Sequence, residues 1–157
     1  MIELLNRIGL LGTGLVLIVN GIYDFKKREI LFVLSLAWGL LGLLWRLVLV
    51  FGFGETTLIR ELSIHMGGFG IAAILLLLSV LLKGVIGPGD GILLLCTVPW
   101  LEDSLYCSAI LLAFLLAATT AMILLLFVKK SPKYQMPFVP FWATGTTVAM
   151  AVYFWGG

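Results

Sequence analysis

Two aspartates, Asp24 and Asp90, lie at the ends of apolar stretches in a chain that contains only eight acidic residues. A carboxylate at membrane depth is energetically costly, so its presence there is a hypothesis of function. Two carboxylates held close together cannot both ionise cheaply, so one keeps its proton while the other loses it. The charged member can then take a proton from water while the neutral member polarises a peptide carbonyl. Such a pair predicts aspartic proteolysis, and we expect neither a metal nor a cofactor.

The second aspartate follows a glycine-rich turn, Gly87-Pro88-Gly89-Asp90. Glycines beside a reactive carboxylate let a substrate backbone approach without a side-chain collision. A structural interpretation stays open for each aspartate alone. An aspartate at a helix end is commonly an interfacial residue or an N-cap, and Asp90 could be the N-cap of a helix that starts at Gly91.

The chain offers little for a metal site. His65 is the only histidine, and Cys96 and Cys107 are the only cysteines. A site built from them would have at most three ligands on three different segments, so we expect no metal. Buried, unreactive thiols are the simpler interpretation of the two cysteines.

The elements that must position the aspartates are membrane helices. The chain of 157 residues is 62% hydrophobic and 11% charged, with a mean hydropathy of +1.18. Only helices or closed barrels can span a bilayer, and the continuous apolar runs favour helices. We therefore expect one membrane-embedded all-α domain over residues 1–157, in contact with the lipid bilayer.

A membrane-spanning helix needs ~20 mostly apolar residues. Six runs approach that length, which predicts six transmembrane helices with a short fourth one. For the fourth we expect a helix from Pro88 to Asp103 whose ends are shielded by protein or by a thinned bilayer. The six apolar runs cover residues 4–23, 30–53, 63–83, 91–101, 104–128 and 138–155.

Basic residues give the orientation. Seven of the ten Lys and Arg residues fall in three connections between runs. The positive-inside rule places these connections in the cytoplasm, which puts both aspartates on the cytoplasmic side and both termini outside. The seven residues are Lys26, Lys27, Arg28, Lys83, Lys129, Lys130 and Lys133.

Polar residues far from the pair have simpler interpretations. Arg46 lies within the second run and can extend its guanidinium outward. We expect His65 to be structural or interfacial. Glu102 and Asp103 are expected in a solvated loop outside the membrane.

Three motifs in order resemble those of the type IV prepilin peptidases and preflagellin peptidases, membrane aspartyl proteases of the GxGD type. GxGD alone is a weak signal, but three motifs at expected cytoplasmic boundaries are specific, and the resemblance covers essentially the whole chain. The motifs are Tyr23-Asp24 with Ile30 six residues on, Gly87-Pro88-Gly89-Asp90, and a basic loop from Lys129 into Pro137-Phe138-Val139-Pro140-Phe141.

The resemblance implies that Asp24 and Asp90 are catalytic, that Gly87 and Gly89 form the supporting turn, and that Pro137, Phe138 and Pro140 begin the last helix. The chain departs from the family pattern in three places. Leu31 follows Ile30 where proline is common, Pro88 is unusual within GxGD, and no lysine follows soon after Asp90. These departures bear on substrate preference and turn geometry.

The implied activity is removal of a basic leader peptide from pilin-like precursors, just before their hydrophobic segment. The implied location is the cytoplasmic (inner) membrane of a prokaryote, as a multi-pass protein whose active site faces the cytoplasm. Larger members also methylate the new N-terminus and carry paired CxxC motifs. This chain has none, so we expect a peptidase without methyltransferase activity, and no nucleic-acid partner.

Two other functions stay open from the residues alone. The same aspartates could relay ions in a small proton- or ion-coupled transporter. Relay carboxylates usually lie toward the bilayer midplane, whereas these lie at the boundary, which favours the protease. The chain could also be a catalytically silent assembly subunit, although such a subunit has no chemical need for both aspartates.

Overall fold

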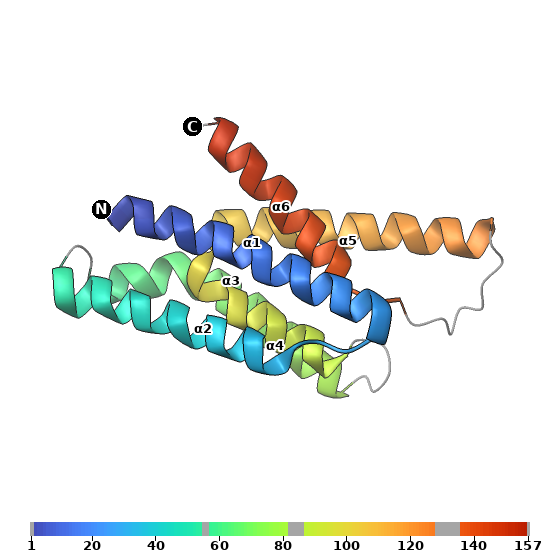
Figure 1. The fold of residues 1–157 in the computed structure, drawn as a ribbon, viewed down its shortest axis with the longest axis horizontal. Helices are drawn as coiled ribbons and strands as arrows, with labels where there is room; N and C mark the ends of the chain where they lie inside the picture. The colour runs from blue at the N-terminus through green and yellow to red at the C-terminus, as the bar shows by residue number, and fades with distance from the viewer. Residues whose placement is uncertain (1, 55–56, 82–86, 128–135, 157) are drawn as a thin grey trace.

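The computed structural model describes residues 2–54, 57–81, 87–127 and 136–156. This part of the chain is helical and contains no strand, so the expected all-α class is confirmed for it. The elements are α1 (Ile2–Lys27), α2 (Phe32–Leu47) continued by the π-helical η1 (Val48–Phe53), α3 (Leu58–Leu81), α4 (Pro88–Thr97) continued by the 3₁₀ turn η2 (Val98–Trp100), α5 (Asp103–Leu126) and α6 (Val139–Gly156) (Figure 1).

Four helices of the described chain are long and apolar enough to cross a membrane: α1, α2 with η1, α3 and α5. Much of their surface is apolar, with Val33 78% and Ile59 80% exposed. An apolar surface of this extent fits a lipid environment better than water. The helices therefore indicate a membrane protein, with four candidate spans where the sequence predicts six.

The two remaining helices, α4 and α6, are not among the candidate spans. As expected, α4 is short, and its ten residues rise only about 15 Å. α6 has 18 residues, but three of them are threonines. The number of times that the chain crosses the membrane therefore depends on whether α4 and α6 each span it.

The helices α1, α2, α3 and α5 run roughly along the long axis, whereas α6 crosses them at an angle (Figure 1). α6 packs against α5 and α1, and α4 packs between α2 and α3. Glycines permit the closest approaches: a Cβ at Gly145 would lie 2.5 Å from the Ala109 carbonyl oxygen, and one at Gly91 would lie 2.8 Å from Leu76 Cα. Small residues at helix interfaces do this commonly in membrane bundles.

The short α4 and its continuation η2 follow α2 over much of its length. A Cβ at Gly39 would lie 2.9 Å from Cys96 Cβ, and one at Gly42 would lie 2.7 Å from Trp100 Nε1. Trp100 also reaches α1, where a Cβ at Gly9 would overlap its ring. α4 and η2 together therefore rise about 20 Å along the bundle, if their 13 residues are taken at helical rise.

Two helix boundaries differ from expectation near the aspartates. α1 continues to Lys27, because a fall in hydropathy marks the end of the apolar run and not the end of the helix. The residue after the helix, Arg28, has a φ of +56°, which does not continue a right-handed helix. At α4, Gly87 is the N-cap and Asp90 is the third helical residue, so Asp90 is not an N-cap before Gly91. The predicted cytoplasmic residues Lys83, Lys129, Lys130 and Lys133 lie outside the described residues.

Candidate functional site

Asp24 lies on the buried face of α1, where it is 6% exposed. Its Oδ2 accepts a hydrogen bond from the backbone N–H of Val139, with an N···O distance of 3.2 Å. Val139 is the first residue of α6. The first N–H groups of a helix lack partners within the helix and carry partial positive charge, so an acid there is favourable. The contact joins the first sequence motif to the third, and the charge of Arg28 also acts on Asp24.

The residues expected at the start of the last helix surround this contact. Pro137 and Phe138 immediately precede Val139, and Pro140 follows it as the second residue of α6. The Phe138 carbonyl oxygen accepts the N–H groups of Phe141 and Trp142, at 3.0 and 3.1 Å, which closes the first turn. Proline early in a helix is tolerated because its missing N–H would have had no partner there. The motif therefore shapes the helix start that meets Asp24.

Asp90 is half-buried in the first turn of α4. Its N–H donates to the Gly87 carbonyl oxygen at 3.0 Å, and its carboxylate folds back over Gly87. A Cβ at Gly87 would lie 3.2 Å from Asp90 Oδ2, and a backbone hydrogen bond from Gly87 acts on the carboxylate. A Cβ at Gly89 would lie 3.1 Å from Ile30 Cγ1. Both glycines of the turn thus allow close contacts that a side chain would crowd.

The charge of Asp24 acts on Asp90 through space. The two residues come from α1 and α4, and the C-terminal end of α1 and the start of α4 lie at the same end of the bundle (Figure 1). Ionisation of one carboxylate disfavours ionisation of a neighbouring one. The arrangement can therefore hold one protonated and one ionised carboxyl group, which is what general acid and general base catalysis on a peptide requires.

Asn20 lies one turn before Asp24 on the same face of α1 and is not part of any of the three sequence motifs. Its side chain is fully buried, and its Oδ1 accepts the Leu31 N–H at 2.8 Å. The available signal was an amide inside an apolar helix, four residues from a candidate catalytic acid. A buried polar side chain needs hydrogen-bond partners, and here one of them lies outside α1.

A second polar cluster lies at the opposite end of the bundle, and it corrects two expectations. Arg46 does not extend outward: its Nε donates to the Pro99 carbonyl oxygen at 2.7 Å, and its Nη1 donates to Glu61 Oε2 at 3.5 Å. Glu102 is exposed as expected. Asp103, however, is not solvated in a loop, because it accepts the N–H groups of Gly67 and Gly68 from α3 at 2.8 and 2.7 Å.

His65 belongs to the same cluster and is 3% exposed. Its Nδ1 lies 3.0 Å from the Glu61 carbonyl oxygen. This cluster is built from opposite charges and backbone donors, so its geometry fixes helices in place. Within the described residues, Cys96 and Cys107 carry free thiols, and no group of three or more His, Cys, Asp or Glu side chains could hold a metal ion.

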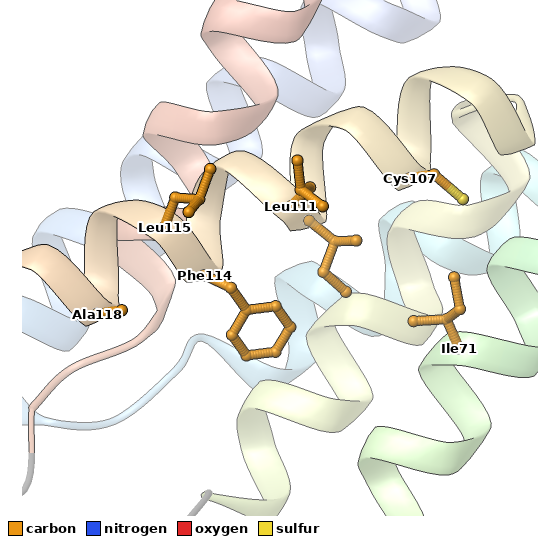
Figure 2. Close-up of a pocket in the computed structure, with 7 residues that line it drawn as sticks. Ile71, Cys107, Leu111, Phe114, Leu115 and Ala118 are labelled. Carbon is orange, nitrogen blue, oxygen red and sulfur yellow. The ribbon is translucent and has the colours of Figure 1, made fainter.

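A hollow of about 540 Å³ lies between α3 and α5. Figure 2 shows Cys107 and Phe114 on α5 pointing to the side on which Ile71 of α3 lies. Apart from the Cys107 thiol the lining is apolar, so the hollow holds no acid or base for hydrolysis. Its lining residues are Ile71, Cys107, Ile110, Leu111, Phe114, Leu115 and Ala118.

Comparison of the chain with protein-family models, with curated proteins and with solved structures finds no match.

Proposed function

We propose that the chain is an aspartic endopeptidase of the type IV prepilin peptidase and preflagellin peptidase kind, which removes the leader peptide of pilin-like precursors. The observation that carries the proposal is the location of the two acids: Asp24 near the end of α1 and Asp90 at the start of α4 lie at the same end of an apolar bundle (Figure 1), close enough for the charge of Asp24 to act on Asp90. The hydrogen bond from Val139 to Asp24 adds support, because it joins the start of the last helix to the same acid.

In the proposed reaction the ionised aspartate takes a proton from a water molecule, and the water oxygen attacks the carbonyl carbon of the scissile peptide. The protonated aspartate donates its proton to the carbonyl oxygen. The tetrahedral intermediate then breaks its C–N bond: the newly protonated aspartate gives its proton to the leaving amine, and a hydroxyl group of the intermediate returns its proton to the other aspartate. Each turnover consumes one water molecule and returns one aspartate protonated and one ionised.

We place the pair at the cytoplasmic face of the inner membrane of a prokaryote, in a single domain over residues 1–157 that crosses the bilayer six times. Lys26, Lys27 and Arg28 lie two to four residues after Asp24 and favour the cytoplasmic side. The fourth crossing is made by α4 and η2. Their rise of about 20 Å falls short of a ~30 Å hydrocarbon core, so a locally thinned bilayer and the flanking α2 and α3 would shield their ends.

The test is leader removal by the purified protein in proteoliposomes, with a pilin-like precursor that has a basic leader, a glycine and an apolar helix. We expect Asp24→Asn and Asp90→Asn each to lower the cleavage rate by about a thousandfold or more, equivalent to at least about 4 kcal/mol in activation free energy. Both variants should still insert into the membrane, because the amide preserves the shape of the carboxyl group.

Glu29→Gln is the matched control. Glu29 is an exposed acid in the connection after α1, so its substitution removes one negative charge close in sequence to Asp24 and should leave the rate within about twofold. Full processing by either aspartate variant would remove the protease proposal. Absence of cleavage in the wild type, together with proton flux that both aspartate variants abolish, would favour the transporter instead.

A further inference from the structure

Asn20 and Asp24 lie four residues apart on the buried face of α1, and the Asn20 side chain has no exposed surface. Residues at this spacing lie one above the other on a helix. A buried amide brings two donor hydrogens and an acceptor oxygen, all of which need partners. The partners of Asn20 therefore show which parts of the fold it holds together.

The side chain of Asn20 links α1 to the start of α2. Its Nδ2 donates to the Val16 carbonyl oxygen at 2.9 Å, within α1. Its Oδ1 accepts the Leu31 N–H at 2.8 Å and lies 3.4 Å from the Ser35 hydroxyl oxygen. Leu31 is the residue immediately before α2, and its side chain supplies no cap. Asn20 therefore fixes the position at which the chain enters α2.

The residue next to Leu31 reaches the turn that bears the second aspartate. A Cβ at Gly89 would lie 3.1 Å from Ile30 Cγ1 and 3.2 Å from Ile30 Cδ1, so Ile30 packs directly on this glycine. Gly89 immediately precedes Asp90. A continuous set of contacts thus runs from Asn20 through Leu31 and Ile30 to the backbone of Asp90.

We propose that Asn20 is a positioning residue that sets the separation of Asp24 and Asp90. It holds Leu31, which keeps Ile30 against Gly89, and this contact keeps the first turn of α4 in place relative to α1. This inference rests on the proposed function, because it takes Asp24 and Asp90 as the catalytic pair. Asn20 itself touches neither water nor substrate in this scheme. Because small displacements of reacting groups cost large factors in rate, loss of Asn20 should act on turnover more than on substrate binding.

Asn20→Leu removes the amide at similar volume, and Thr13→Val is the matched control. Thr13 is also fully buried in α1, and its hydroxyl accepts Trp38 Nε1–H at 3.0 Å, so it joins α1 to α2 far from Asp24. We expect Asn20→Leu to lower kcat for leader removal by about tenfold or more, with KM within about twofold. Thr13→Val should leave kcat and KM near the wild-type values.

A second readout does not depend on activity. Ile30→Cys and Gly89→Cys, introduced together into a chain with Cys96→Ala and Cys107→Ser, should form a disulfide readily on mild oxidation. Adding Asn20→Leu should slow this cross-linking several-fold, whereas Asn20→Asp, which keeps an acceptor for the Leu31 N–H, should restore the rate. If Asn20→Leu does not accumulate in the membrane, Asn20→Ala takes its place in both experiments.

The proposal is overturned if the amide-free Asn20 variant cross-links as fast as its parent. It is also overturned if this variant and Thr13→Val lower kcat equally, because that result would mean a general loss of α1–α2 packing. If no protein, wild type included, removes a leader, the proposed function fails, while the cross-linking rates still decide whether Asn20 holds Ile30 against Gly89.

Discussion

The two ends of the helix bundle each contain buried or half-buried acids, but the groups that face these acids differ. At one end, which we call the Arg46 end (Arg46, Glu61, His65 and Asp103), Glu61 pairs with Arg46, and Asp103 accepts two backbone N–H groups. At the Asp24 end (Asp24, Asp90 and the start of α6), Asp24 accepts one backbone N–H group from Val139, and the charge of Asp24 acts on a second acid, Asp90.

This difference separates a structural use of charge from a chemical one. An acid that pairs with an arginine, as Glu61 does, or that accepts two backbone N–H groups from another helix, as Asp103 does, is held in one position, so it joins helices together. Two acids close enough for the charge of one to act on the other can share one proton, which is typical of functional sites. The comparison predicts that substitutions at the Arg46 end lower stability, whereas substitutions at the Asp24 end lower activity.

The largest effect on stability should come from Arg46→Ala. Removing one partner of a buried ion pair leaves the other charge uncompensated, and this typically costs about 3–5 kcal/mol. Glu61 would be left in that position, with a side chain only 11% exposed. Denaturant titration of the purified protein in micelles would measure the loss. Arg60→Ala removes an exposed arginine from the same region and should change the free energy of unfolding by less than about 0.5 kcal/mol. Equal losses in the two variants would break the comparison.

Asp103→Ala should have a smaller effect. It leaves the Gly67 and Gly68 N–H groups without their acceptor, and a hydrogen bond to a charged group contributes about 1.5–3 kcal/mol. The same titration, with the exposed neighbour substituted in Glu102→Ala as the control, would measure the difference. Leader cleavage by Asp103→Ala should stay close to that of the wild type under conditions where the variant remains folded. A loss of cleavage without a loss of stability would place a functional group at the Arg46 end and would contradict the comparison.

The smallest expected effect concerns pH. A pair that must be half-protonated should give a cleavage rate that rises and then falls with pH, because both the doubly protonated and the doubly ionised states are inactive. His65 is the only histidine, and it lies at the Arg46 end, so His65→Gln should leave the shape of this profile unchanged. A profile that loses one limb in His65→Gln would assign that limb to the histidine.

Apolar runs were enough to predict the helices and the shortness of α4, because burial of backbone in lipid requires continuous helical hydrogen bonding. They did not predict that α1 extends past Asp24 to Lys27, since a helix can continue into the interface. The apolar runs also did not predict that α2 continues as the π-helix η1, because a run of apolar residues is compatible with either an α-helix or a π-helix.

The candidate acids followed from residue type and spacing, whereas their supports depend on contacts between distant segments. Arg46 was expected to extend outward because the sequence does not show that its partners, Pro99 and Glu61, which lie on other elements, come close to it in the fold. Asp103 was assigned to a solvated loop for the same reason. Asn20 could have been noticed as an amide one turn from Asp24, but its partner Leu31 is a backbone group that sequence does not reveal.

Cross-linking between positions 24 and 90, the two proposed catalytic positions, tests the central claim most directly. Asp24→Cys and Asp90→Cys would be combined in a chain with Cys96→Ala and Cys107→Ser, treated in native membranes with a short bifunctional thiol reagent, and analysed by mass spectrometry. The account predicts an efficient 24–90 cross-link and none between Asp24→Cys and Asp103→Cys, which lie at opposite ends of the bundle. If the cysteines at positions 24 and 90 each react with a monofunctional thiol reagent but do not cross-link to each other, the claim that the two positions lie close together is contradicted.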